Sequence, residues 1–123
     1  MNTMMRLSLL LALVISMCGC KTVVAPGADP VVVRAEQTAE VALETFDAFL
    51  RWERANSAAL PESVRAVARD IRLHGKRWIV ELREATKAYK RDRNGNNLDR
   101  VLFAQKLLEI AVNEIKLQTA KPK

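Results

Sequence analysis

Few of the side chains that carry enzymatic chemistry occur in this chain of 123 residues. His74 is its single histidine, and its two cysteines, Cys18 and Cys20, lie together near the N-terminus. A catalytic histidine needs a nucleophile, an acid or a metal beside it, and a structural zinc site needs several histidine or cysteine ligands. The sequence places no such partners near His74. We therefore expect a packing role for His74, and we expect no enzymatic activity, no cofactor and no metal site.

The first twenty residues have the layout of a secretory signal peptide. Arg6 is the one charged residue in this stretch, an almost wholly apolar run covers residues 7–17, and the small Gly19 precedes Cys20. This order of a positive start, an apolar middle and a small residue is typical of exported chains. The run is too short for an uncleaved anchor, because a membrane-spanning helix needs roughly 20 residues. A soluble secreted protein remains the alternative, although Met17 suits its cleavage pattern poorly.

The segment Met17-Cys18-Gly19-Cys20 resembles the lipobox of bacterial lipoproteins, with Met17 where the family prefers leucine and Cys18 where it prefers alanine or serine. The resemblance implies a signal peptide over residues 1–19, cleavage before Cys20, a diacylglycerol thioether on Cys20 and acylation of its new amino group. It places the chain in the bacterial cell envelope, with the membrane as a partner through the lipid. Lys21 is similar to an outer-membrane sorting signal, which implies the periplasmic face if the host is Gram-negative.

Composition indicates one small helical domain behind this segment. Residues 20–28 make a short lipidated tether and residues 29–123 make the domain, with only four glycines and four prolines in the whole chain. Such a composition favours helix over sheet. Cleavage before Cys20 leaves a single cysteine and no disulfide, so stability must come from an apolar core. The formal charge of +6 does not indicate nucleic acid, which an exported chain rarely meets, and we expect no small-molecule substrate.

Apolar residues at helical spacing predict three amphipathic helices at about 30–57, 61–93 and 97–119, folded as an antiparallel up-down-up bundle. Asp29 should cap the first helix before Pro30, Gly95 should end the second in a left-handed conformation, and Asn97 should cap the third. Gly75 is the weak point of the second helix, where a kink or a break is expected. The predicted apolar stripes comprise Ala35, Ala39, Ala42, Leu43, Phe46, Phe49, Leu50, Val64, Val67, Ala68, Ile71, Trp78, Leu82, Ala85, Tyr89, Leu98, Val101, Leu102, Leu108, Val112 and Ile115.

Charged residues add a second pattern to the first two helices. At about 100° per residue, the acidic residues of the first helix and the basic residues of the second lie at equal offsets from their apolar faces, so they meet along one side of an antiparallel pair. This register sets Asp47 level with Ile71 and Glu36 level with Leu82. Each exposed pair is worth about 0.2–1 kcal/mol, so the pattern specifies register more than stability. The predicted ion-pair stripe comprises Glu36, Glu40, Glu44, Asp47, Arg69, Arg72, Lys76 and Arg83.

The cations left over form a basic cluster at the end of the second helix, made of Lys87, Lys90, Arg91 and Arg93. One interpretation is contact with anionic lipid head groups, lipopolysaccharide phosphates or peptidoglycan carboxylates, to which each cation near the surface contributes about 1 kcal/mol. The other interpretation is structural, because cations favour the negative end of a helix dipole and keep a surface soluble.

Amphipathic helices without a catalytic arrangement favour a non-enzymatic function. The leading hypothesis is a membrane-anchored envelope lipoprotein that acts as a helical protein-interaction or structural accessory module, with another envelope protein as its partner. The basic cluster supports the alternative of an envelope-surface binder. A loose resemblance to small lipoproteins carried by prophages implies a third hypothesis, a role in host lysis.

Overall fold

The computed structural model describes residues 25–120, and these are helical throughout apart from short connections, which confirms the all-α fold class. The predicted signal segment, Cys20 and the first part of the tether lie outside the described residues. The chain forms α2 (Pro30–Asn56), a 3-10 turn (Ser57–Ala59), α3 (Glu62–Asp70), a π-helical segment (Ile71–Gly75), α4 (Lys76–Arg91) and α5 (Gly95–Thr119).

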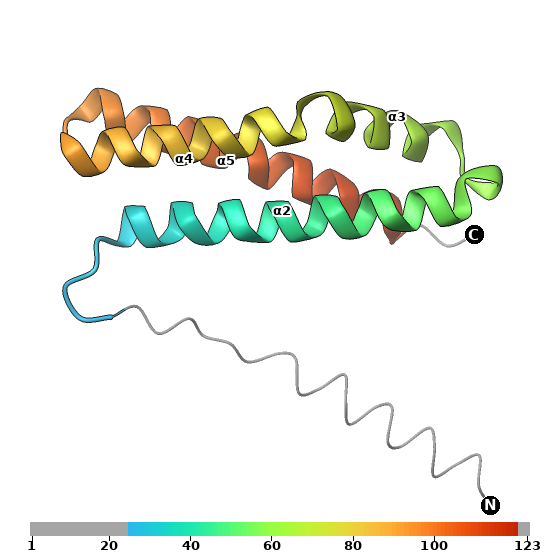
Figure 1. Ribbon diagram of the computed structural model, residues 1–123, viewed down its shortest axis with the longest axis horizontal. Coiled ribbons are helices and arrows are strands. Elements are labelled where there is room, and N and C mark those ends of the chain that lie inside the picture. Colours follow the sequence, from blue (N-terminus) through green and yellow to red (C-terminus); the bar gives the residue numbers. More distant parts are fainter. Residues whose placement is uncertain (1–24, 121–123) are drawn as a thin grey trace, which may run out of the picture.

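The helices form an elongated bundle. α3 and α4 return along α2, and α5 then runs in the same direction as α2 (Figure 1). Because α2, α4 and α5 all contact one another, the bundle has a triangular cross-section over most of its length. Each pair of helices therefore leaves an outer groove that lies opposite the third helix.

The start of α2 follows the sequence prediction. The Asp29 carboxylate accepts a hydrogen bond of 2.9 Å from the backbone N–H of Val31, and Pro30 occupies the first helical position. An aspartate cap satisfies one of the N–H groups that have no partner within the helix, and proline there loses no hydrogen bond. Asp29 also lies 3.5 Å from Arg93, so its carboxylate connects the start of α2 to the loop that follows α4.

The predicted helix 61–93 is divided into α3 and α4 by the π-helical segment, so the described residues hold four α-helices where three were expected. Gly75 ends this segment and is buried. A Cβ atom built on Gly75 would lie 3.0 and 3.1 Å from two ring carbons of Phe46 and 3.2 Å from Ile71. The missing side chain thus lets the Phe46 ring of α2 approach the backbone closely, at the position where the sequence predicted a break.

The turn between α4 and α5 differs from the prediction. α4 ends at Arg91, and α5 begins at Gly95, which has a negative φ and takes no left-handed cap. Asn94 caps α5 instead, since its side chain accepts a hydrogen bond of 2.9 Å from the backbone N–H of Asn97. The Asn97 side chain donates to the backbone carbonyl of Asp92 at 2.8 Å and so helps to close the end of α4. The sequence pattern thus predicted an asparagine cap for this helix correctly, but the cap is Asn94 and not Asn97.

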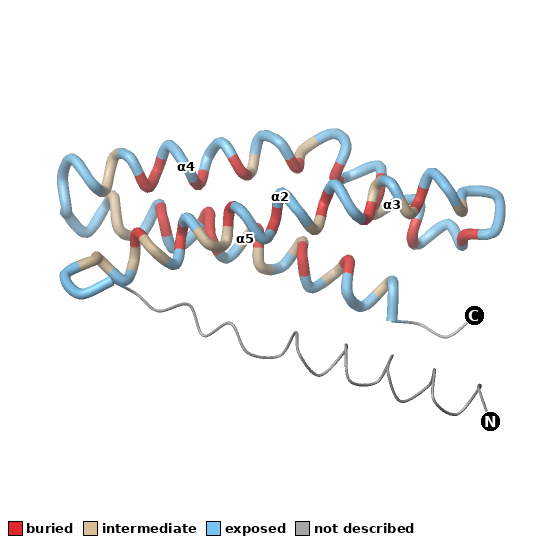
Figure 2. The backbone as a smooth tube through the Cα atoms, turned by 60° about the horizontal axis from the view of Figure 1, so that its bottom comes forward, coloured by how far each residue is buried: buried red, intermediate tan, exposed pale blue. Residues whose placement is uncertain are grey.

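Buried positions recur along the inward sides of α2, α4 and α5 (Figure 2). Most predicted core residues are buried, but Leu43 and Leu102 are 45% and 49% exposed, and Trp78 is only half-buried. Ile79 takes the inward position that was expected of Trp78. A π-helical turn contains more residues than an α-helical turn, so the segment changes which residues of α4 face inward. Leu43 and Leu102 lie at the edges of their stripes, where apolar spacing alone does not fix burial.

Candidate functional site

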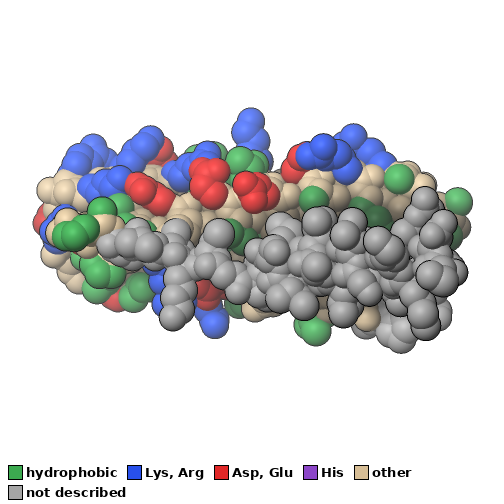
Figure 3. Space-filling model, turned by 90° about the horizontal axis from the view of Figure 1, so that it is seen from below, with side chains coloured by type: hydrophobic (Ala, Val, Ile, Leu, Met, Phe, Trp, Pro, Cys, Tyr) green, Lys and Arg blue, Asp and Glu red, His purple; other side chains and the backbone are tan. Residues whose placement is uncertain are grey.

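The contact between α2 and α4 contains part of the predicted ion-pair stripe. Arg83 donates to Glu40 at 2.7 Å, so these two members of the predicted stripe pair with each other, and Glu36 pairs with Lys90, which was predicted to be free. Acidic and basic side chains gather together along the upper edge of the molecule in Figure 3. The pairing is displaced from the predicted register, which had set Glu36 level with Leu82. Side chains of a helix lean toward its N-terminus. In an antiparallel pair, two residues that form an ion pair therefore both lie closer to the C-terminal ends of their helices than two residues whose Cα atoms are level.

The remaining members of the stripe do not pair as predicted. Arg72 pairs with Glu53 at the end of α2, Arg69 pairs with Glu62 of its own helix at 2.9 Å, and Asp47 pairs with Arg51. Glu44 and Lys76 have no ion-pair partner within residues 25–120. Of the predicted stripe, only Glu36, Glu40 and Arg83 therefore form ion pairs between α2 and α4 within the described residues. The sequence pattern overlooked Glu53, whose carboxylate is 7% exposed and satisfied by Arg72.

An open groove occupies the middle of this contact, where the ion-pair stripe is interrupted. Its lining is mostly apolar, with Leu43 and Val80 on its two edges at 45% and 47% exposure and Phe46 between them on the floor. The groove is also lined by Asp47 of α2 and by Lys76 of α4, and Lys76 has no ion-pair partner within residues 25–120. We call it the α2/α4 groove, and its lining comprises Leu43, Phe46, Asp47, Leu50, Ile71, Arg72, Lys76, Ile79, Val80 and Arg83.

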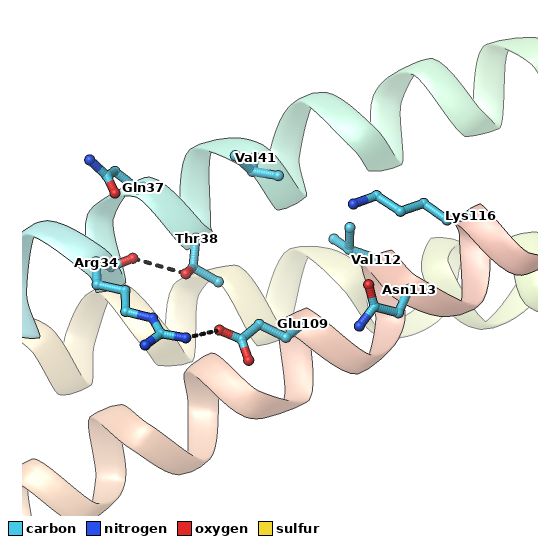
Figure 4. Close-up of a pocket in the computed structure, with 8 residues that line it drawn as sticks. All are labelled: Arg34, Gln37, Thr38, Val41, Glu109, Val112, Asn113 and Lys116. Carbon is cyan, nitrogen blue, oxygen red and sulfur yellow. Dashed lines mark hydrogen bonds and ion pairs between the residues drawn. The ribbon is translucent and has the colours of Figure 1, made fainter. Parts of the chain in front are cut away.

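A second groove, between α2 and α5, is polar (Figure 4). Arg34 of α2 donates to a carboxylate oxygen of Glu109 at 3.3 Å, and the buried Gln105 side chain donates to the same oxygen at 2.9 Å. The hydrogen bond from Gln105 is the main cause that holds the pKa of Glu109 below its usual range, and Arg34 adds to it. Lys116 and Asn113 line the other end of this groove. No sequence pattern indicated this contact, because Arg34 and Glu109 are distant in the chain.

Replacing Gln105 by leucine should raise the pKa of Glu109 toward its ordinary value, because the largest favourable contact of the charged form is lost. A depressed carboxylate pKa stabilises the fold above the unfolded pKa of about 4.3 and loses this contribution as the pH falls through the lower folded value. An NMR titration of the Glu109 side chain measures the shift. Glu84, whose pKa is lowered mainly by its hydrogen bond with Lys87, serves as the control, and its titration should not move; an unchanged titration of Glu109 would contradict the assignment.

The basic cluster predicted to be free is largely paired. Lys90 contacts Glu36, Lys87 contacts Glu84 at 2.7 Å, and Arg93 lies 3.5 Å from Asp29. Arg91 makes no ion pair at contact distance within residues 25–120, although its charge helps to lower the pKa of Glu84. The sequence prediction of four unpaired cations is therefore wrong for three of them, because acids at the start of α2 and within α4 reach the same end of the bundle.

His74 lies on the π-helical segment at the edge of the core. Its ring is tilted against Trp78 at a centroid distance of 5.7 Å. Its Nε2 atom lies 3.6 Å from Asp70, four residues earlier, so the expectation that no acid lies near His74 was wrong. Among residues 25–120, no three histidine, cysteine or acidic side chains come together as metal ligands would. The same residues contain no helix with the length and hydropathy of a membrane-crossing segment.

The geometry thus defines a class of structure, a small helical bundle with an apolar groove between α2 and α4 and a polar groove between α2 and α5. Comparisons with protein-family models, with curated proteins and with solved structures find no match to this chain. Interpretation of its function therefore depends on the grooves themselves and on the N-terminal segment.

Proposed function

We propose that this chain is a lipid-anchored envelope lipoprotein that acts as a non-enzymatic helical interaction module. The N-terminal segment ending at Cys20 supplies the anchor, through its resemblance to a lipobox. The helical domain supplies the binding surface, and the short tether keeps this surface close to the membrane. Cys20 carries the lipid, and the membrane is the outer membrane if the host is Gram-negative.

The observation that carries the proposal is the α2/α4 groove. Leu43 and Val80 flank a floor that includes Phe46. An apolar groove between two helices commonly binds a helix of a partner. The basic cluster supports the alternative of an envelope-surface binder less well, because Lys87, Lys90 and Arg93 already contact acids of this chain. The polar α2/α5 groove is the weaker docking surface, since its apolar lining is limited to Val41 and Val112.

A photo-crosslinking amino acid at position 80 of the full chain, introduced in its native cells, tests the proposal. Position 73 is the matched control, because Leu73 is 69% exposed on the same rod of helices but does not line the groove. We expect a protein adduct at position 80 that is at least about tenfold more abundant than at position 73, because only position 80 would lie against the partner. Equal adducts at both positions, or adducts with lipid alone, would refute the proposal.

A further inference from the structure

We infer that the occupant of the α2/α4 groove is α5 of a second copy of this chain. Copies then join side by side in a row, each through two different surfaces. This inference names the partner within the proposed function and rests on it. Two features that the isolated bundle leaves unexplained support it together: the open groove, and a helix α5 that is apolar on both sides.

The outer side of α5 carries Phe103, Ile110 and Leu117, which are 73%, 56% and 63% exposed. Residues seven apart recur within about 20° on a helix, so these three form one stripe. The stripe lies about 180° from Val101 and Leu108, both fully buried in the core. A soluble helix that is apolar on two opposite sides usually has a partner on each of them.

Charged residues flank this stripe on opposite sides. Counting about 100° per residue from Ile110, Lys106 lies about 40° to one side and Glu114 about 40° to the other. Neither residue makes an ion pair within residues 25–120, although Glu114 accepts a hydrogen bond from Gln118. On either side of Ile110, the apolar line of α5 therefore has a basic and an acidic neighbour, while Asp99 and Arg100 lie nearer the start of the helix.

The α2/α4 groove presents the complementary charges. Asp47 lines its α2 side, where it pairs with Arg51 one turn further along the same helix, and Lys76 lines its α4 side and lacks an ion-pair partner within the described residues. When α5 of a second copy lies in the groove parallel to α2, the right-handed helix turns Lys106 toward Asp47 and Glu114 toward Lys76. In this orientation Ile110 comes to rest near the middle of the groove, over Phe46.

The same orientation suits a membrane anchor. α5 runs in the direction of α2 within one bundle (Figure 1), so an α5 that is parallel to the α2 of its neighbour makes the two whole bundles parallel. The starts of all α2 helices, which follow the tether, then lie on the same side of the row and face the same membrane. Because the groove lies opposite α5 in the triangular cross-section, each copy can offer α5 to one neighbour and the groove to the other. Such a heterologous contact extends into a ring or a filament.

Native mass spectrometry of the detergent-solubilised full chain tests the inference with two variants. Val80→Asp damages the groove and Ile110→Asp damages the α5 stripe, and both residues are about half exposed, so the monomer should keep its fold, which circular dichroism checks. The wild type should form dimers and larger species. Each variant alone should show at least a tenfold loss of these species. An equal mixture should form dimers and nothing larger, because each variant retains the surface that its partner lacks.

Charge variants provide a second test that leaves the apolar surfaces intact. Asp47→Lys and Lys106→Glu should each weaken assembly, and their mixture should restore dimers, since the exchanged charges then attract across the contact. A monomeric wild type, or aspartate variants that assemble as the wild type does, would overturn the inference. A crosslink from position 80 to a different protein would overturn it too while leaving the proposed function in place.

Discussion

Replacing Leu82 by alanine should lower the free energy of unfolding by about 2–5 kcal/mol, because the lost apolar contacts are accompanied by a cavity that the bundle fills only in part. Leu82 is fully buried on α4, at the side that faces α2 and α5. Small domains are stable by only about 5–15 kcal/mol, so this loss is a large share of the total. Urea denaturation followed by circular dichroism measures it.

Leu102 provides the matched control for this experiment. Apolar spacing assigned Leu102 to the core, whereas the structure exposes 49% of it. Leu102→Ala should therefore change the free energy of unfolding by about 0.5 kcal/mol or less, as surface substitutions usually do. Equal losses for Leu82→Ala and Leu102→Ala would show that α4 and α5 do not present the faces described above.

Features that depend on residues close together in the chain were predicted from the sequence. The cap at Asp29, the interruption of the α-helix near Gly75 and most of the inward positions of α2 depend on neighbours within one or two turns. On α4 the predicted Leu82 and Ala85 are buried, but Ile79 lies inward where Trp78 was expected. The close approach of Phe46 to Gly75 was not predicted, because the two residues lie in different helical segments. A sequence pattern carries no signal for such a contact.

The candidate sites were less predictable than the fold. Charge spacing placed Glu40 and Arg83 on facing stripes, and these two residues pair, but it also placed Glu44 and Lys76 there, which have no ion-pair partner within residues 25–120. The α2/α4 groove depends on how the two helices pack against each other, so the sequence pattern did not indicate it. The opposite error occurred at the basic cluster, where acids from a distant segment reach cations that the pattern left free; Lys90 is the example.

The second large effect is expected at Cys20. A thioether needs the cysteine sulfur, so Cys20→Ser should abolish attachment of a fatty acid and, with it, cleavage before residue 20. Cys18→Ser is the matched control, because Cys18 lies in the segment that is removed and should leave acylation intact. Labelling of cells with an alkyne fatty acid measures both variants. Label retained by Cys20→Ser, or lost from Cys18→Ser, would contradict the proposed anchor.

The intact mass of the protein extracted from its native membranes tests the proposed lipid anchor most directly. We expect a single species that contains residues 20–123 with a diacylglyceryl group and an amide-linked acyl chain on Cys20. A species without any acyl group, whether it begins at residue 1 or at a later residue, would contradict it.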